Sequence, residues 1–213
     1  MRFWLLTLFS LTLSASEIGE ISELQGNGEI SRLNSEESLT AELSSDIFSF
    51  DDVRTGNGRL AIEFLDKSVV KLTEHSKLVI DEFIYDPDPS KSKLALNMAS
   101  GTARFITGGL GLINKENISI KTPTASIGIR GTDFTATVDE LGRSLIILLP
   151  NADGTSSGEI TVTTAMGVEI LNEAFQATMV SAWEQEPTPA VTLGNMTLGM
   201  IDNMLIVQKP QEV

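Results

Sequence analysis

Residues 59–64 read Arg59-Leu60-Ala61-Ile62-Glu63-Phe64, and three of them, Leu60, Ile62 and Phe64, alternate with smaller or charged residues. Successive side chains of a β-strand point to opposite faces, so this alternation predicts a half-buried strand. The same two-residue period recurs at Val70/Leu72, Leu78/Ile80, Leu94/Leu96/Met98, Ile118/Ile120, Ile127/Ile129, Phe134/Ala136/Val138, Leu145 to Leu149, Ile160/Val162, Val168/Ile170 and Phe175/Ala177/Met179. We therefore predict an all-β fold of many short strands.

Clusters of Gly, Pro, Asn and Asp separate these units, as the turns between strands require. They lie at residues 56–58, 86–89, 108–109, 142, 151–158 and 167. Short strands at this spacing fit a sandwich, a barrel or a solenoid, and all three present the same alternation. We expect a solenoid-like or sandwich-like arrangement, and the periodicity does not choose between them.

Composition excludes several classes of function. The 213 residues carry 29 Asp and Glu against 15 Lys and Arg, a net charge of −14 that repels a phosphate backbone, so we expect no nucleic-acid partner. With no Cys and one His, the chain has no thiolate nucleophile and no multi-histidine metal site. We expect no cofactor.

The first fifteen residues resemble a secretory signal. Arg2 precedes an apolar stretch of eleven residues, 3–13, and small residues follow at 14–16. Eleven residues make about 16 Å of helix, too short for a membrane span. We predict a signal peptide over residues 1–15, export of the chain, and no membrane span in the mature protein.

The tail departs from the β pattern. Pro187 and Pro189 cannot donate to a ladder, so residues 186–192 are predicted to form a linker after a β domain that covers residues 16–185. Beyond it, Met196, Met200 and Met204 repeat every four residues. This spacing predicts a short apolar C-terminal helix, or a tail, over residues 193–213.

Five spaced fragments between residues 53 and 138 carry a recognisable pattern. Their sequences are VRTGNG at 53–58, IEFLDKS at 62–68, LTEHSKL at 72–78, SGTARF at 100–105 and TPTASIGIRGTDF at 122–134. In this order they resemble the FecR-type domain, and the last is similar to its most distinctive signature. The positions that carry the resemblance are Thr55, Gly56, Asp66, Ser76, Gly101, Arg104, Thr122, Pro123, Arg130, Gly131, Thr132 and Phe134.

The resemblance implies an all-β extracytoplasmic module that binds a protein or senses a signal, without catalytic activity. It also implies a bacterial envelope, so we expect a periplasmic or secreted location. The namesake regulators carry a cytoplasmic anti-sigma segment and a membrane span. Because this sequence begins with a signal-like stretch, we expect neither here.

Arg130 and Asp66 are interpreted as structural residues. Arg130 lies in a run of apolar and small residues, where an unpaired buried charge would be costly, so we predict that its guanidinium binds a carboxylate or carbonyls within the domain. Arg59 is expected on a solvated strand face instead. Asp66 is interpreted as a turn residue first and a ligand second.

Two loops have the oxygen-rich composition that calcium prefers. One holds Asn151, Asp153, Ser156 and Glu159, and the other holds Asp86 and Asp88. Neither has the EF-hand spacing, and Asx and Gly turns have the same composition, so structural turns are the favoured interpretation.

Carboxylate pairs such as Asp51/Asp52, Asp81/Glu82 and Asp139/Glu140 are adjacent, and adjacent residues on a strand point to opposite faces. We therefore predict no enzyme. The favoured hypothesis is an exported noncatalytic FecR-like module that binds a protein partner or envelope component in signalling. The alternative is a surface-structural or adhesive β protein stabilised by calcium. A carbohydrate-binding role would need exposed aromatics, for which Trp183 and Tyr85 are the candidates.

Overall fold

The computed structural model describes residues 16–33, 35, 37–109, 117–197 and 199–200. Within these ranges, fifteen strands join into one sheet, which confirms the all-β prediction. The strands are β1 (Glu17–Ser31), β2 (Leu39–Thr40), β3 (Asp46–Phe48), β4 (Asp52–Phe64), β5 (Val69–Leu72), β6 (Lys77–Ile84), β7 (Lys93–Ile106), β8 (Ile118–Lys121), β9 (Ser126–Arg130), β10 (Asp133–Val138), β11 (Ser144–Leu148), β12 (Glu159–Thr163), β13 (Val168–Leu171), β14 (Gln176–Val180) and β15 (Val191–Thr192). A 3-10 turn, η1 (Pro89–Lys91), precedes β7.

Three long strands change partners along their length. Residues 52–54 of β4 pair with β6, whereas residues 60–63 pair with β5. Similarly, residues 93–100 of β7 pair with β6, and residues 103–106 pair with β5. β1 follows β4 antiparallel through both halves. Each long strand therefore belongs to two layers of the sheet.

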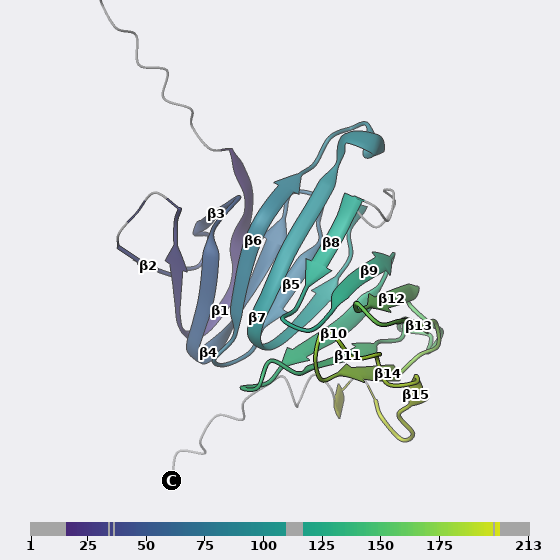
Figure 1. Cartoon of the computed structure of the whole chain (residues 1–213). Helices are drawn as coiled ribbons and strands as arrows, with labels where there is room; N and C mark the ends of the chain where they lie inside the picture. Colours follow the sequence, from purple (N-terminus) through teal and green to yellow (C-terminus); the bar gives the residue numbers. More distant parts are fainter. Residues whose placement is uncertain (1–15, 34, 36, 110–116, 198, 201–213) are drawn as a thin grey trace, which may run out of the picture.

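The first layer contains β2, the second half of β1, the first half of β4, β6, the first half of β7, β8, β9, β12 and β13. The second layer contains β3, the first half of β1, the second half of β4, β5, the second half of β7, β10, β11, β14 and β15. Strands that pass from one layer to the other at bends are typical of orthogonally packed sheets. Of the two arrangements left open by the sequence, the sandwich-like one describes this pairing. In Figure 1, β1–β3 lie at the left end and β12–β15 at the right.

The bend of β7 is visible in its burial pattern. Its first half buries Leu94, Leu96 and Met98, and its second half buries Ala103 and Phe105, so the buried face moves from even to odd positions. The change occurs beside Gly101, which has a φ of 84°. A left-handed conformation of this kind favours glycine, and it turns the strand into the other layer.

The bends of β1 and β4 lie against each other. Gly26 has a φ of 83°, and a Cβ there would lie 2.1 Å from the carbonyl oxygen of Asn57. Gly58, opposite Gly26 in register, is equally close to Gln25. The prediction of a turn at residues 56–58 is therefore wrong, because these residues form a bend within one continuous strand.

The two layers pack around one apolar core. Phe64 of β4 and Phe83 of β6 stack across the layers with ring centroids 4.9 Å apart. The predicted apolar face of the 59–64 strand is confirmed, since Leu60, Ile62 and Phe64 are at most 2% exposed. Ala61 on the opposite face is 1% exposed, so that face is partly buried as well.

The long first strand was not predicted from alternation. β1 carries Glu at several outward positions, and register shifts at residues 21–23 and 26–28 interrupt its period. It buries Ile18, Ile21 and Ile30, which are spaced irregularly because of these shifts. A search for strict alternation cannot find a strand of this kind.

Residues 186–192 lie against the sheet. Pro187 is buried, the Thr188 amide donates to the Met179 carbonyl at 2.9 Å, and β15 pairs with β14. Leu193 and Met196 pack on a small cluster of buried residues from β11 and β14. The predicted C-terminal helix is not shown, because only residues 199 and 200 are helical and residues 198 and 201–213 lie outside the described ranges. The predicted signal peptide, residues 1–15, also lies outside them.

We predict that Gly101→Ala destabilises the protein far more than Gly154→Ala. Both glycines have nearly the same φ, 84° and 83°. A Cβ at Gly154 meets nothing within 4 Å, whereas a Cβ at Gly101 would lie 2.5 Å from the Ser76 Cα. Gly154→Ala should lower the free energy of unfolding by about 1 kcal/mol, and Gly101→Ala by about 2–4 kcal/mol. Urea unfolding measures both, and equal losses would contradict a packing requirement at the bend.

Candidate functional site

Several signature residues form a hydrogen-bond network at the bends of β4 and β7. The Ser76 amide donates to the Thr55 hydroxyl at 2.9 Å, and that hydroxyl donates to the Thr73 carbonyl. The Ser76 hydroxyl donates to the Thr102 carbonyl at 3.1 Å and accepts from the Thr102 amide at 3.0 Å. Ser76 is 2% exposed, close beside Gly101. These groups satisfy backbone atoms that the bends leave without a ladder partner.

The half-buried ion pair of the signature is formed by Arg104, not by Arg130. Arg104 Nε lies 2.9 Å from Asp133 Oδ1, and Nη2 lies 2.7 Å from Oδ2, a bidentate contact between β7 and β10. The two side chains are 14% and 19% exposed. Arg130, for which this role was predicted, is exposed at the end of β9, opposite Glu159 in register. Arg59 is half-buried beside Gln25 of β1.

Asp66 forms the β4–β5 turn, as predicted. Its carboxylate accepts the Ser68 amide at 3.0 Å and the Ser68 hydroxyl at 2.5 Å. The Ser68 hydroxyl also accepts the Gly108 amide at 2.8 Å, which joins the turn to the chain after β7. Lys67 has a φ of 68°, so it holds the left-handed position that glycine usually takes.

Several residues of the longest fragment also make contacts within the domain. The Thr122 hydroxyl accepts the Ala125 amide at 3.0 Å and the Ser144 hydroxyl at 2.7 Å, and Pro123 follows it at the β8–β9 turn. The Thr132 amide donates to the Thr107 hydroxyl at 3.1 Å. Gly131 has a φ of 56°, and Phe134 is fully buried, stacked on Phe105. Gly56 accepts the His75 amide through its carbonyl.

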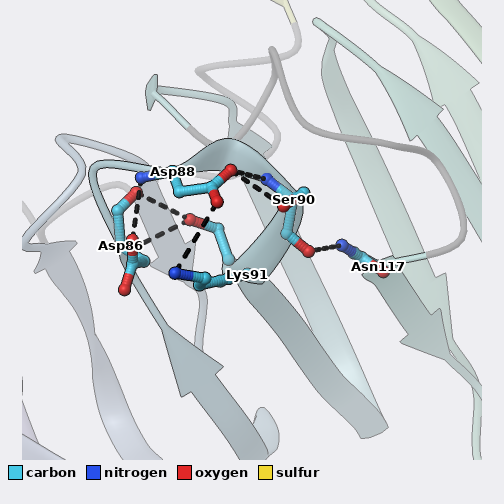
Figure 2. Close-up of polar contacts among 6 residues, drawn as sticks. Asp86, Asp88, Ser90, Lys91 and Asn117 are labelled. Atoms are coloured by element: carbon cyan, nitrogen blue, oxygen red, sulfur yellow. Dashed lines mark hydrogen bonds and ion pairs between the residues drawn. The ribbon is translucent and has the colours of Figure 1, made fainter.

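The Asp86–Asp88 loop is a set of Asx turns before η1. Asp86 Oδ1 accepts the Asp88 amide at 2.8 Å, and Asp88 Oδ1 accepts the amide and hydroxyl of Ser90 (Figure 2). Lys91 lies 3.7 Å from Asp88 Oδ2. Asn117 donates to the Ser90 carbonyl at 3.1 Å. The Ser90 hydroxyl and amide hold the pKa of Asp88 below its usual value.

The 151–159 loop has the same character. Asp153 Oδ1 accepts the Thr155 amide at 3.0 Å and the Thr155 hydroxyl at 2.6 Å, and these bonds lower the pKa of Asp153. The Asn151 side-chain Nδ2 donates to the Ser156 carbonyl, and the Ser156 hydroxyl donates to the Gly158 carbonyl. Glu159 lies at the start of β12. Over the ranges that the structure describes, no three Asp, Glu or His side chains gather in a metal-binding group.

Asp51 and Asp52 are adjacent but differ in environment. Asp51 is 1% exposed and accepts the Phe48 amide at 2.9 Å, and burial raises its pKa against the opposing effect of Arg32. Burial would also raise the pKa of Asp52, but hydrogen bonds from Arg54 and Lys77 outweigh it and hold that pKa below its usual value. The two carboxylates therefore do not share one site.

The surface that sequence reasoning missed lies at the β12–β15 end. Val168 and Ile170 alternate as a strand requires, but their side chains are 56% and 49% exposed. Further along the chain, the side chains of Met179, Trp183 and Val191 are each at least 41% exposed. Apolar alternation predicted the strands but could not tell a buried face from an exposed one.

Tyr85, the other aromatic candidate, is 51% exposed after β6. A polar hollow between β1 and β4 is lined by Asn27, Glu29, Thr40 and Arg54. Within the described ranges, no helix is long and apolar enough to cross a bilayer.

Known proteins provide an independent comparison. Residues 51–151 match the family model described as FecR protein. This stretch is similar to a FecR domain. The matched stretch begins at Asp51, directly before β4, and ends after β11, so it contains all five signature fragments and the hydrogen-bond partners described for them. The resemblance predicted from the sequence is thereby confirmed.

Two crystal structures, at 2.50 Å and 1.65 Å resolution, of a candidate anti-sigma factor from Parabacteroides distasonis ATCC 8503 are similar to this chain. Each is 16% identical with a TM-score of 0.48, and the alignment covers 64% of this chain. The match spans 57% of the length of those structures. A search of curated proteins finds no match to this chain.

We predict that Arg104→Ala lowers the free energy of unfolding by about 1.5–3 kcal/mol, because it leaves the Asp133 carboxylate half-buried without its bidentate partner. Arg130→Ala is the control and should change it by less than about 0.5 kcal/mol, because that side chain is exposed. Chemical denaturation of both variants measures the difference. Equal losses would show that Arg104 has no special structural role.

Asp51→Asn and Asp52→Asn should respond to pH in opposite directions. The pKa of Asp51 is raised in the folded protein. As the pH rises above about 4, ionisation of its carboxyl group therefore lowers the free energy of unfolding. The pKa of Asp52 is lowered in the folded protein. Its carboxylate therefore stabilises the fold above about pH 4, and this stabilisation is lost as the pH falls through the pKa of the folded state. From pH 3 to pH 7, Asp51→Asn should gain stability relative to wild type, and Asp52→Asn should lose it. Thermal melts across this range test the signs, and parallel curves would contradict them.

Proposed function

We propose that this chain is an exported, noncatalytic FecR module that binds a protein partner or another envelope component in signalling. The observation that supports it best is that the polar signature groups are hydrogen-bonded within the protein. Thr55, Asp66, Ser76, Arg104 and Thr122 all make internal hydrogen bonds within or beside the FecR domain. Their chemistry is used to hold the bends and turns of the fold. Recognition therefore falls to the outer surface.

The outer surface also favours binding over catalysis. The acidic pairs named in the sequence occupy different environments, and the oxygen-rich loops use their carboxylates in turns. Exposed apolar side chains gather on β13, β14 and β15, an arrangement that marks interaction surfaces more often than reaction centres. The signal-like residues 1–15 support export to the periplasm or beyond.

Site-specific photo-crosslinking in living cells tests this proposal. A photoreactive residue is placed at Leu33, which is 72% exposed near β1, and in a second variant at Ile170, which is 49% exposed on β13. We expect a discrete crosslinked protein from at least one of the two positions, in the envelope fraction, identified by mass spectrometry. A photoreactive residue at the buried Ile160 serves as the control and should crosslink only within the chain. Recovery of the chain in the cytoplasm with residues 1–15 intact would contradict the proposal, and so would the absence of any discrete product from both surfaces.

A further inference from the structure

Strand β13 forms the end of the first layer, and among the described residues no strand pairs with its outer edge. In the described ranges it pairs with β12 alone, with Val162 opposite Glu169 and Thr163 opposite Val168. The Thr164 amide donates to Gly167 O at 2.9 Å at the hairpin turn. Hydrogen-bonded pairs alternate along an antiparallel ladder, so Glu169 and Leu171 bond to β12. The amide and carbonyl groups of Val168 and Ile170 consequently point away from β12.

The described residues provide no backbone partner for these groups, and both side chains are about half exposed, at 56% and 49%. Glu169, between them, is held by the Ala190 amide, which donates to its carboxylate at 2.9 Å. Natural edge strands are commonly protected by Lys, Pro or a bulge, and β13 has none of these. An edge without these features can serve as a template for an added strand.

The charged side chains of the segment that contains β13 are of one sign. Residues 144–200 contain no Lys or Arg, and they contain six carboxylates: Asp153, Glu159, Glu169, Glu173, Glu184 and Glu186. The Glu186 side chain lies beside the β12–β13 hairpin, since a Cβ on Gly167 would come within 3.2 Å of its Cγ. Glu173, Glu184 and Glu186 are exposed. A second copy of this chain would bring the same negative charge, so the surface is complementary to a basic partner instead.

We propose that β13 binds an extended segment of a partner protein as an added strand, and that this segment carries apolar residues alternating with Lys or Arg. The partner's backbone pairs with Val168 and Ile170, its apolar side chains cover theirs, and its cationic side chains face the surrounding carboxylates. This inference rests on the proposed function and deepens it, because it assigns a surface and a chemistry to the partner.

Binding of synthetic peptides to the full chain tests the inference. The probe is an alternating Lys-Val heptapeptide, and two companions replace Lys by Glu or methylate the valine amide nitrogens. By fluorescence anisotropy, the Lys-Val peptide should bind wild type, and added salt should weaken it. The Glu-Val and N-methylated peptides should bind at least about tenfold more weakly. Equal binding of all three would overturn the inference, as would no binding of any.

Two variants locate the site. Ile170→Pro removes a backbone amide that points away from β12. It should weaken binding of the Lys-Val peptide by about tenfold or more, while the pairing of β12 with β13 remains. Leu141→Thr changes an exposed apolar side chain, 76% exposed, in the turn between β10 and β11 and should bind as wild type does. Circular dichroism checks that both fold, and the N-methylated peptide tests the edge on wild type alone. Equal binding by all three proteins would overturn the assignment to β13.

Sedimentation of the chain without peptide tests the competing occupant. A monomer is expected, and a dimer that Ile170→Pro dissociates would assign the edge to a second copy and overturn the inference. Envelope crosslinks at Leu33 with no peptide binding would remove the β13 assignment and leave the proposed function standing. Peptide binding without any envelope crosslink would leave the β13 chemistry intact and remove the proposed function.

Discussion

The structure depends on three strands that belong to two layers. β1, β4 and β7 each pair with different neighbours in their two halves, and they bend beside Gly26, Gly58 and Gly101. The close approach of backbone at these points leaves no room for a Cβ. Each bend also changes which positions face the core, so the side-chain alternation on either side must be out of phase. The sequence meets this requirement in β7, where buried positions move from even to odd.

Bends interrupt ladders, and the polar signature residues compensate for the interruption. Ser76 and Thr55 satisfy backbone groups at the bends, Asp66 and Ser68 connect a turn to the chain after β7, and Arg104 joins β7 to β10. A buried amide or carbonyl without a partner costs as much as a lost hydrogen bond. This explains why the domain contains so specific a pattern of Thr, Ser, Asp and Arg. The pattern marks the positions where backbone groups need hydrogen-bond partners from side chains.

Much of the fold could be predicted from local periodicity, because β4 to β14 present alternating or short apolar units. β1 could not, because its register shifts break the period. The glycines at 56–58 were predicted as a turn, since sequence alone does not distinguish a reversal from a bend within a strand. An ion pair was predicted for Arg130 because its neighbours are small and apolar. It is formed by Arg104 instead, whose partner, Asp133, is set by the pairing of β7 with β10. The exposed edge of β13 depends on which strand ends a layer, and that is a property of topology alone.

The sharing of strands between layers has a mechanical consequence. In an ordinary sandwich the two sheets pack through side chains and are joined by loops between strands. Here covalent chain crosses between the layers at β1, β4 and β7, so separating the layers requires breaking the ladders of the same strands on both sides. The described strands should therefore behave as one rigid body on the time scale of binding, and a load applied at β13 would reach β1 through continuous hydrogen-bonded sheet without a hinge to absorb it.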